Sequence, residues 1–165
     1  LNEASSLDPF LAATSALGEK LGPLLLQLPP GLAFQPVRVE RFLDLLRARF
    51  SGLVACEPRH PSWFSPQAEG LMAAFSVARV AADPAIHPLG TRPGSWQGLA
   101  YYRLHGSPQM YSSAYSDEFL QSFARLLLEA AGSSPVWCIF NNTAAGAALG
   151  NALTALENLG PWSLA

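Results

Sequence analysis

The chain alternates short apolar segments with longer amphipathic ones, and this alternation occurs five times. Each apolar segment has the length of a buried strand, and the residues after it place apolar side chains at helical spacing. A strand followed by a helix pairs most readily with the next strand in parallel, through a right-handed crossover. The sequence therefore predicts an α/β protein with parallel strands, adjacent in chain order, near residues 23–28, 53–57, 77–82, 99–105 and 136–141.

Capping residues mark where the helices begin. Asp8 followed by Pro9 is typical of an N-cap and a first helical position, and Ser65 and Ser116 have the same capping character. Together with the apolar spacing, these signals predict helices over residues 8–21, 37–50, 65–75, 116–131 and 144–159.

Two architectures accommodate five such units. A doubly wound sheet normally has a glycine-rich phosphate loop after its first strand, whereas a (β/α) barrel needs none. No G-x-G-x-x-G or P-loop sequence occurs in the chain, and this favours the barrel. We therefore predict an α/β fold that is a partial TIM-type (β/α) barrel, with about five of eight parallel units in a single domain over residues 1–165.

Composition restricts the partners of such a domain. Half of the residues are hydrophobic and the net charge is −2, so nucleic acid is a disfavoured partner, though a local basic patch stays possible. No apolar stretch of about 18 residues predicts a membrane span. Cys56 and Cys138 lie in apolar strands and are expected to be buried, unpaired thiols, which indicates a cytoplasmic location.

Residues two apart on a strand share a face, and this predicts the interior of the sheet. On the expected interior face, small residues such as Ala55 and Ala81 are followed by polar residues at the strand ends, while Cys56 and Val80 face the helices. Parallel strands bring their carboxyl ends to one edge. We expect one cavity there, lined by Glu57, Arg59, Asp83, Arg103, His105 and Asn141.

The segment from Glu57 to Trp63 contains the densest group of functional side chains. It places Glu57, Arg59, His60 and Trp63 directly after a buried strand. Charged groups are costly to bury unless they are paired, so the segment indicates either a salt-bridged strand end or a site. In a site, Glu57 and His60 would be catalytic, and Arg59 and Trp63 would bind substrate.

Arg103 and His105 form a second candidate group, with Asp83 on the preceding strand. Arg103 could hold a phosphate or carboxylate through two hydrogen bonds, His105 could transfer a proton, and Asp83 could act as a base. Two alternatives stay open. Arg103 could simply pair with Glu57 or Asp83, and Glu57, Asp83 and His105 could ligate a divalent metal ion. The sequence identifies no cofactor.

Several further polar and aromatic residues lie at the same strand ends. Gln27 and Asn141 are candidate substrate contacts, and Trp63 and Tyr115 could form a stacking surface or lid, although ordinary loop packing is the alternative. Asn142 and Thr143 precede a helix, and at least one of them is expected to be a helix cap.

The order and spacing of several segments resemble the family catalogued as domain of unknown function 72, the YecE-like proteins. These segments are GPLLLQLPP (22–30), EPRHPSWF (57–64), YYRLHG (101–106) and FNN with NA (140–142 and 151–152). The resemblance implies a TIM-like barrel, with Glu57, Arg59, His60, Trp63, Arg103 and His105 matching family positions. Thr143 stands where many members have an acidic residue. The Gly-Thr-Ser-Gly-Trp opening of the family pattern is absent, so we expect the chain to be the C-terminal part of a larger barrel.

Three functional hypotheses follow. The first is an enzyme, acting on an anionic or polyhydroxylated small molecule at the C-terminal strand ends. The second is a nucleic-acid or phosphodiester-processing protein that uses the arginines and loop aromatics. The third is a non-catalytic remnant of the barrel, in which open sheet edges would favour self-association.

Overall fold

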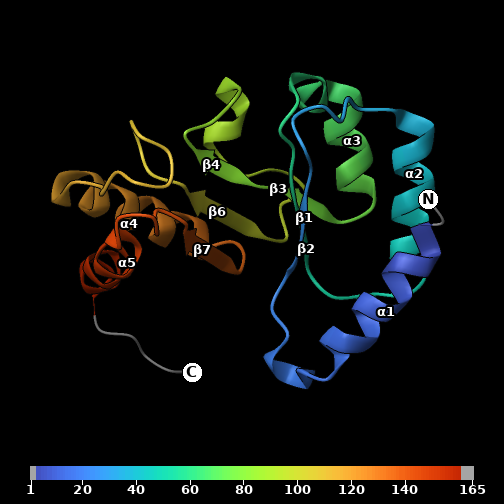
Figure 1. Cartoon of the computed structure of the whole chain (residues 1–165), viewed down its shortest axis with the longest axis horizontal. Coiled ribbons are helices and arrows are strands. Elements are labelled where there is room, and N and C mark those ends of the chain that lie inside the picture. The colour runs from blue at the N-terminus through green and yellow to red at the C-terminus, as the bar shows by residue number, and fades with distance from the viewer. Residues whose placement is uncertain (1–2, 161–165) are drawn as a thin grey trace.

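The computed structural model describes residues 3–160, in which strands and helices alternate (Figure 1). The strands are β1 (Leu24–Gln27), β2 (Val54–Glu57), β3 (Val77–Arg79), β4 (Ala81–Asp83), β5 (Gly94–Ser95), β6 (Ala100–Leu104) and β7 (Val136–Phe140). The α-helices are α1 (Glu3–Ser15), α2 (Pro36–Arg47), α3 (Pro66–Ala74), α4 (Asp117–Ala131) and α5 (Ala147–Asn158), with short 3-10 turns η1 (Gly18–Lys20), η2 (Pro61–Phe64) and η3 (Pro88–Thr91). No helix within residues 3–160 has the length and apolar character needed to cross a bilayer.

The predicted strands pair in parallel and in chain order. β1 pairs with β2 and β2 with β3, while β4 pairs with β6 and β6 with β7. The third predicted strand is divided at Val80, so that its first half, β3, pairs with β2 and its second half, β4, pairs with β6. The parallel α/β fold is therefore confirmed. The described residues form two open sheets and no closed barrel, so the TIM-type barrel is not confirmed.

The prediction of which side chains face the interior and which face the helices is wrong for the third strand. In the register, Ala78 lies beside Ala55, and both belong to the apolar cluster on the interior face, together with Val80. Ala81 instead packs with the residues that face the helices. Because side chains alternate, Asp83 lies on that helix-facing side as well, which reverses the predicted orientation.

Arg79 gives the physical reason for this orientation. Its guanidinium is buried and needs a carboxylate, which Glu69 of α3 supplies at 2.5 Å on the helix side of the sheet. Glu69 also accepts hydrogen bonds from the backbone and hydroxyl of Ser95, and so holds β5, which was not predicted, antiparallel to β3. The sequence pattern showed that the third strand ends in the polar residue Asp83, but it did not show that Glu69 pairs with Arg79.

Helices cover the outward face of both sheets. One apolar cluster joins β1, β2 and β3 to α2 and α3 through residues such as Val54, Leu46 and Met72. A second joins β6 to α4 and α5 through residues such as Tyr102 and Leu120. Figure 1 shows this arrangement, with α2 and α3 beside β1 to β3 and with α4 and α5 beside β6 and β7. This packing against the helices holds the strands in place on their outward face.

Two predicted helix boundaries are wrong. α1 already contains Glu3 and runs through Pro9; Asp8 is therefore inside the helix rather than at its cap, and its exposed carboxylate pairs with Arg49 at 2.7 Å. α5 begins at Ala147 rather than near residue 144, because Gly146 has a φ of 76°, which an α-helix cannot contain. The capping serines Ser65 and Ser116 are confirmed as predicted.

Neither Cys56 nor Cys138 forms a disulfide, as predicted. Cys56 is buried, which confirms the prediction, whereas Cys138 is only partly buried. Burial raises the pKa of each thiol to about 12. At pH 8 the thiolate fraction should be roughly 1,000-fold below that of a free cysteine. We expect neither thiol to react with Ellman's reagent in the native protein, and two to react after denaturation without reductant. Fewer than two under denaturation, or a fast-reacting native thiol, would contradict this.

Candidate functional site

The candidate site lies where β1, β2 and β6 end at the same edge of the fold. Glu57 is the last residue of β2, Gln27 is the last residue of β1, and Arg103 belongs to β6 with His105 just beyond its end. Their side chains meet on the concave face of the sheets, opposite the helices. The parallel pairing of the strands is what brings the ends together.

Glu57 is at the centre of this group. It is only 3% exposed, and each of its carboxylate oxygens is occupied. Oε1 accepts hydrogen bonds from Nη2 of Arg59 at 3.1 Å and pairs with Nε2 of His105 at 2.9 Å. Oε2 accepts from Nη1 of Arg103. Three donors from one strand and one loop thus converge on a single buried carboxylate.

These contacts determine the charge of the group. Burial alone would raise the pKa of Glu57, but the hydrogen bond with His105 and the charges of Arg103 and Arg59 outweigh burial and hold that pKa below its usual value. Burial likewise opposes the charge of Arg59, but its interactions with Tyr111 and Glu57 outweigh burial and raise the pKa of Arg59. Glu57 is therefore ionised at neutral pH, and two guanidinium groups share its one negative charge.

Arg103 extends from β6 across the concave face to β1. Its Nη1 donates to Oε1 of Gln27 at 2.7 Å as well as to Glu57. Its Nε is buried and has no hydrogen-bond partner among the described residues. Since β2 and the third strand lie between β1 and β6 in the sheet order, this contact requires a strongly curved arrangement of the strands.

His105 is the most deeply buried titratable residue of the group, at 2% exposure. With Glu57 ionised, Nε2 is the nitrogen that donates to the carboxylate. Nδ1 is buried without a partner in the described part of the chain, and the ring of Tyr111 contacts the imidazole edge-on. A small cavity of about 30 Å³ lies beside Glu57, Arg59, His105 and Met110, enough for one water-sized group. With the ring proton on Nε2, Nδ1 of His105 carries a lone pair and can itself accept a proton.

A second hydrogen-bonded network supports the loop after β6. The hydroxyl of Tyr115 donates to Oδ2 of Asp83 at 2.7 Å and accepts from the backbone N–H of Gly106 at 2.8 Å. Burial and the Asp83 hydrogen bond raise the pKa of Tyr115, so the phenol stays protonated and donates. Gly106 has a φ of 93°, and a Cβ there would lie 2.9 Å from the carbonyl oxygen of Ser113. The turn therefore requires glycine.

Two buried asparagines complete this network. Oδ1 of Asn151 accepts from the backbone N–H of Tyr115 at 3.0 Å and from Nδ2 of Asn142 at 2.8 Å. Nδ2 of Asn151 donates to the carbonyl of Tyr115 at 3.2 Å, and Nδ2 of Asn142 donates to that of Ser113 at 3.0 Å. α5 thereby fixes the loop that follows His105.

The structure separates the predicted site residues into groups. Gln27, Glu57, Arg59, Arg103 and His105 come together as expected. Asp83 and Tyr115 contact each other on the helix-facing side, so the expectation that Asp83 joins Glu57 and Arg103 is wrong. The reason is the reversed orientation of the third strand. The predicted metal set of Glu57, Asp83 and His105 is not assembled either, and no cluster of three metal-ligating side chains occurs among residues 6–160, whose side chains the structure describes.

His60 and Trp63 lie outside the Glu57 group, whereas the place of the Asn141 side chain in the cavity stays a prediction. Nδ1 of His60 caps η2 by accepting from the N–H of Ser62 at 3.2 Å and contacts its hydroxyl at 2.8 Å. Trp63 is buried in the core, where its Nε1 donates to Leu32 at 2.8 Å. It is therefore not a lid over the strand ends. Asn141 follows β7, and its backbone N–H donates to the carbonyl of Leu104 at 2.7 Å.

The sequence interpretation missed the supporting role of the asparagines. The prediction that Asn142 or Thr143 caps the last helix is wrong, because α5 begins four residues after Thr143 and its N-cap residue is Gly146, which offers no side chain. The sequence did contain a signal, since Asn142 and Asn151 both belong to the spaced FNN and NA segments. Only the fold shows that the two side chains bind each other.

We expect Glu57→Gln to lower the free energy of unfolding by about 3 kcal/mol at pH 7, because it leaves buried Arg103 without a counterion. The folded-state pKa of Glu57 is lowered, so its contribution is complete above the unfolded pKa of 4.5 and is lost as pH falls through the folded value. Denaturant unfolding between pH 3 and 7 should show a shallower acid loss in the variant. Glu40→Gln, on the exposed side of α2, is the control, and an equal effect of both changes would contradict the expectation.

We expect Asn151→Ala to cost about 2–3 kcal/mol in the free energy of unfolding, since it leaves buried polar groups of Tyr115 and Asn142 unpaired. Asn158→Ala removes an amide from the exposed face of the same helix, where Asn158 donates only to the carbonyl of Thr154, and should cost under about 0.5 kcal/mol. Denaturant unfolding of both variants tests the network. A similar cost for the two would show that it does not support the loop.

Comparison with known proteins agrees with this structure. A family model described as "Protein of unknown function DUF72" matches residues 1–163. A crystal structure of a DUF72 family protein from Enterococcus faecalis V583 aligns with a TM-score of 0.79 at 21% identity, covering 98% of this chain and 68% of that one. One from Thermotoga maritima MSB8 aligns with a TM-score of 0.80 at 23% identity, covering 98% and 67%.

The search of curated proteins found no match. At these identities the solved structures show the fold alone, while the family model extends over nearly the whole sequence. The resemblance read from the spaced motifs is thereby confirmed, and the chain belongs to the DUF72 family.

Proposed function

We propose that this protein is an enzyme that binds an anionic or polyhydroxylated small molecule at the C-terminal ends of β1, β2 and β6. One observation carries the proposal: two guanidinium groups, of Arg59 and Arg103, converge on a single buried carboxylate, that of Glu57. The pair of cations exceeds the one anion by one positive charge. A phosphate or carboxylate of a substrate supplies the missing negative charge and can accept hydrogen bonds from both arginines.

The role of Glu57 in this proposal is to position the cations and the imidazole. A carboxylate that pairs with Nε2 fixes the orientation of a histidine and leaves its other nitrogen available for proton transfer. Nδ1 of His105 is that nitrogen, and its lack of a partner supports the assignment. His105 then accepts a proton from a bound hydroxyl or water, while Arg59 and Arg103 hold the anionic end of the substrate.

Substrate recognition extends to β1 in this proposal. Gln27 is exposed at the end of β1 and accepts a hydrogen bond from Arg103. Its amide N–H groups suit a hydroxyl of a polyhydroxylated substrate. The small cavity beside His105 fits one functional group rather than a whole molecule, so the remainder of the substrate would extend over the open strand ends.

We also propose that the curved sheets are an arc of a (β/α) barrel. The contact between Gln27 of β1 and Arg103 of β6 spans the concave face at one end. At the other end, the indole of Trp137 in β7 fills the space beside Gly22, just before β1. Sites of (β/α) barrels lie at the C-terminal ends of the strands, and this analogy of fold agrees with the position of the Glu57 group.

Arginine substitution tests the proposal. We expect isothermal titration calorimetry to detect binding of inorganic phosphate or citrate to the protein, and Arg103→Ala and Arg59→Ala to weaken it about 10- to 100-fold. Arg59 lies in a loop, and its loss leaves Glu57 paired with Arg103 and His105, so this variant keeps the test valid if Arg103→Ala unfolds. Arg125→Ala makes the same charge change on the exposed face of α4 and should bind like the wild type. If all three variants bind alike, or neither anion binds the wild type, the proposal is wrong.

A further inference from the structure

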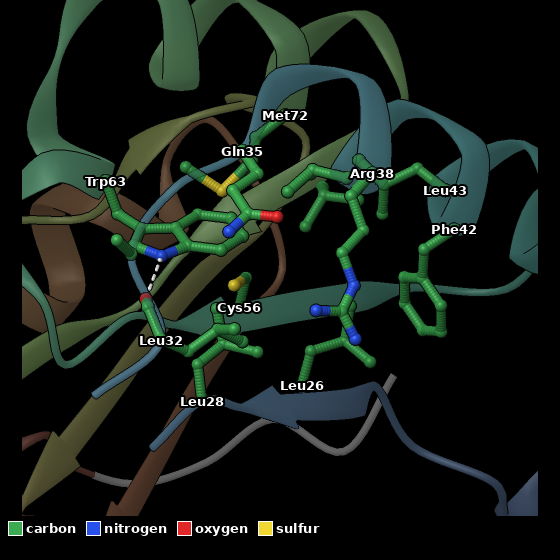
Figure 2. Close-up of a pocket in the computed structure, with 13 residues that line it drawn as sticks. Leu26, Leu28, Leu32, Gln35, Arg38, Phe42, Leu43, Cys56, Trp63 and Met72 are labelled. Carbon is green, nitrogen blue, oxygen red and sulfur yellow. Dashed lines mark hydrogen bonds between the residues drawn. The ribbon is translucent and has the colours of Figure 1, made fainter. Parts of the chain in front are cut away.

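A second cavity lies on the opposite side of β2 from the Glu57 group. It has a volume of about 240 Å³, is partly open to solvent and is lined by residues of β1, β2, β3, η2, α2 and α3. Figure 2 shows the ring of Trp63 on one side and that of Phe42 on the other, with Leu26 and Leu28 along one edge. Gln35 and Arg38, both exposed, stand at its rim. No residue of the Glu57 group lines it.

The walls of this cavity are apolar and fixed. Trp63, Met72, Leu43 and Cys56 are buried members of the core cluster between the sheet and the helices. The one polar atom of the Trp63 ring, Nε1, already donates to the carbonyl of Leu32 at 2.8 Å. The walls are therefore preformed by residues that the fold itself holds in place.

Water has little to bind in this space. The buried side-chain atoms without hydrogen-bond partners within residues 3–160 belong to Arg103, His105 and Asn142, and none of these lines the cavity. An ordered internal water normally makes about three hydrogen bonds. Apart from Gln35 and Arg38, the side chains that line this space are apolar, and such a lining suits an apolar occupant, which would replace missing van der Waals contacts.

Size defines the class of that occupant. An apolar cavity of about 150 Å³ accepts benzene, so about 240 Å³ accommodates a molecule of two fused rings. The aromatic rings of Trp63 and Phe42, on opposite sides of the cavity, and the thioether of Met72 favour an aromatic body. A polar substituent would meet the side chains at the rim.

We propose that this cavity is a binding site for a compact bicyclic aromatic molecule, distinct from the anion site and independent of the proposed enzymatic function. The ligand enters past Gln35 and Arg38, lies between Trp63 and Phe42, and leaves its polar substituent at the rim. β2 separates the two sites: Cys56 lines this cavity and Glu57, the next residue, faces the other side.

The two methionines of the chain allow a direct test, because they report the two sites separately. Met72 lines the apolar cavity, whereas Met110 lines the small cavity beside Glu57 and His105. In protein labelled with ¹³C at the methionine methyl groups, 2-naphthol should shift the Met72 signal saturably and leave that of Met110 unchanged. Met110→Leu assigns the two signals, since Met110 is exposed.

A matched pair of substitutions on α2 locates the binding. Val39→Phe places a larger ring in the cavity and should weaken 2-naphthol binding at least tenfold, with no loss of thermal stability. Val37→Phe makes the same change at a position that is 81% exposed on the same helix and should leave binding unchanged. The Met72 signal of the wild type decides the question even if Val39→Phe does not fold.

Three results would overturn the inference: no saturable shift of Met72, non-saturable shifts of both methionines, or equal binding by the two valine variants. The anion site is tested by phosphate and citrate with arginine variants, so failure of either proposal is visible without the other.

Discussion

The buried carboxylate of Glu57 constrains the rest of the strand ends. β2 is buried along its whole length, and an ionised group at its end is tolerated only when hydrogen bonds replace the lost water. Arg103 and His105 supply these bonds from β6, and Arg59 from the loop that follows β2. Removing any one donor leaves Glu57 with fewer partners, whereas removing Glu57 leaves two guanidiniums together. Glu57 is therefore the member on which all the others depend, since each of the three donors binds it.

β6 has the central position because its two faces serve different purposes. Arg103 and His105 point to the concave side, while Tyr102 and Leu104 pack against the helices. Immediately afterwards, the turn at Gly106 passes the chain to the network of Tyr115, Asn142 and Asn151. A shift of one residue in the register of β6 would exchange the charged face for the apolar one. The buried polar contacts on one side and the apolar core on the other thus fix the same register.

Much of this fold follows from local patterns in the sequence. Five apolar segments separated by amphipathic ones are sufficient to predict parallel strands, and capping residues such as Ser65 and Ser116 locate helix starts because their interactions are local. The members of the Glu57 group were also predictable, since alternation along β2 and β6 is regular. Each of these inferences needs only neighbours within a few residues.

Two of the errors have a different origin, because each depended on a partner distant in the sequence. The third strand is oriented by the contact of Arg79 with Glu69. In the same way, Trp63 is held in the core by Leu32 rather than lying over the strand ends. A side chain with two possible partners binds the one that the tertiary structure places beside it. The local sequence pattern does not show which partner that is.

The loop between β2 and α3 links the two sides of the sheet. Arg59 belongs to the charged group, and Trp63, four residues later, belongs to the apolar core. Between them, His60 caps η2, and the hydroxyl of Ser62 accepts from the backbone N–H of Phe34, whose ring contacts the indole of Trp63. These contacts leave the loop few alternative conformations. The same short loop therefore carries a charged side chain to one face of the sheet and an aromatic side chain to the other, and the contacts between them fix its backbone on both sides.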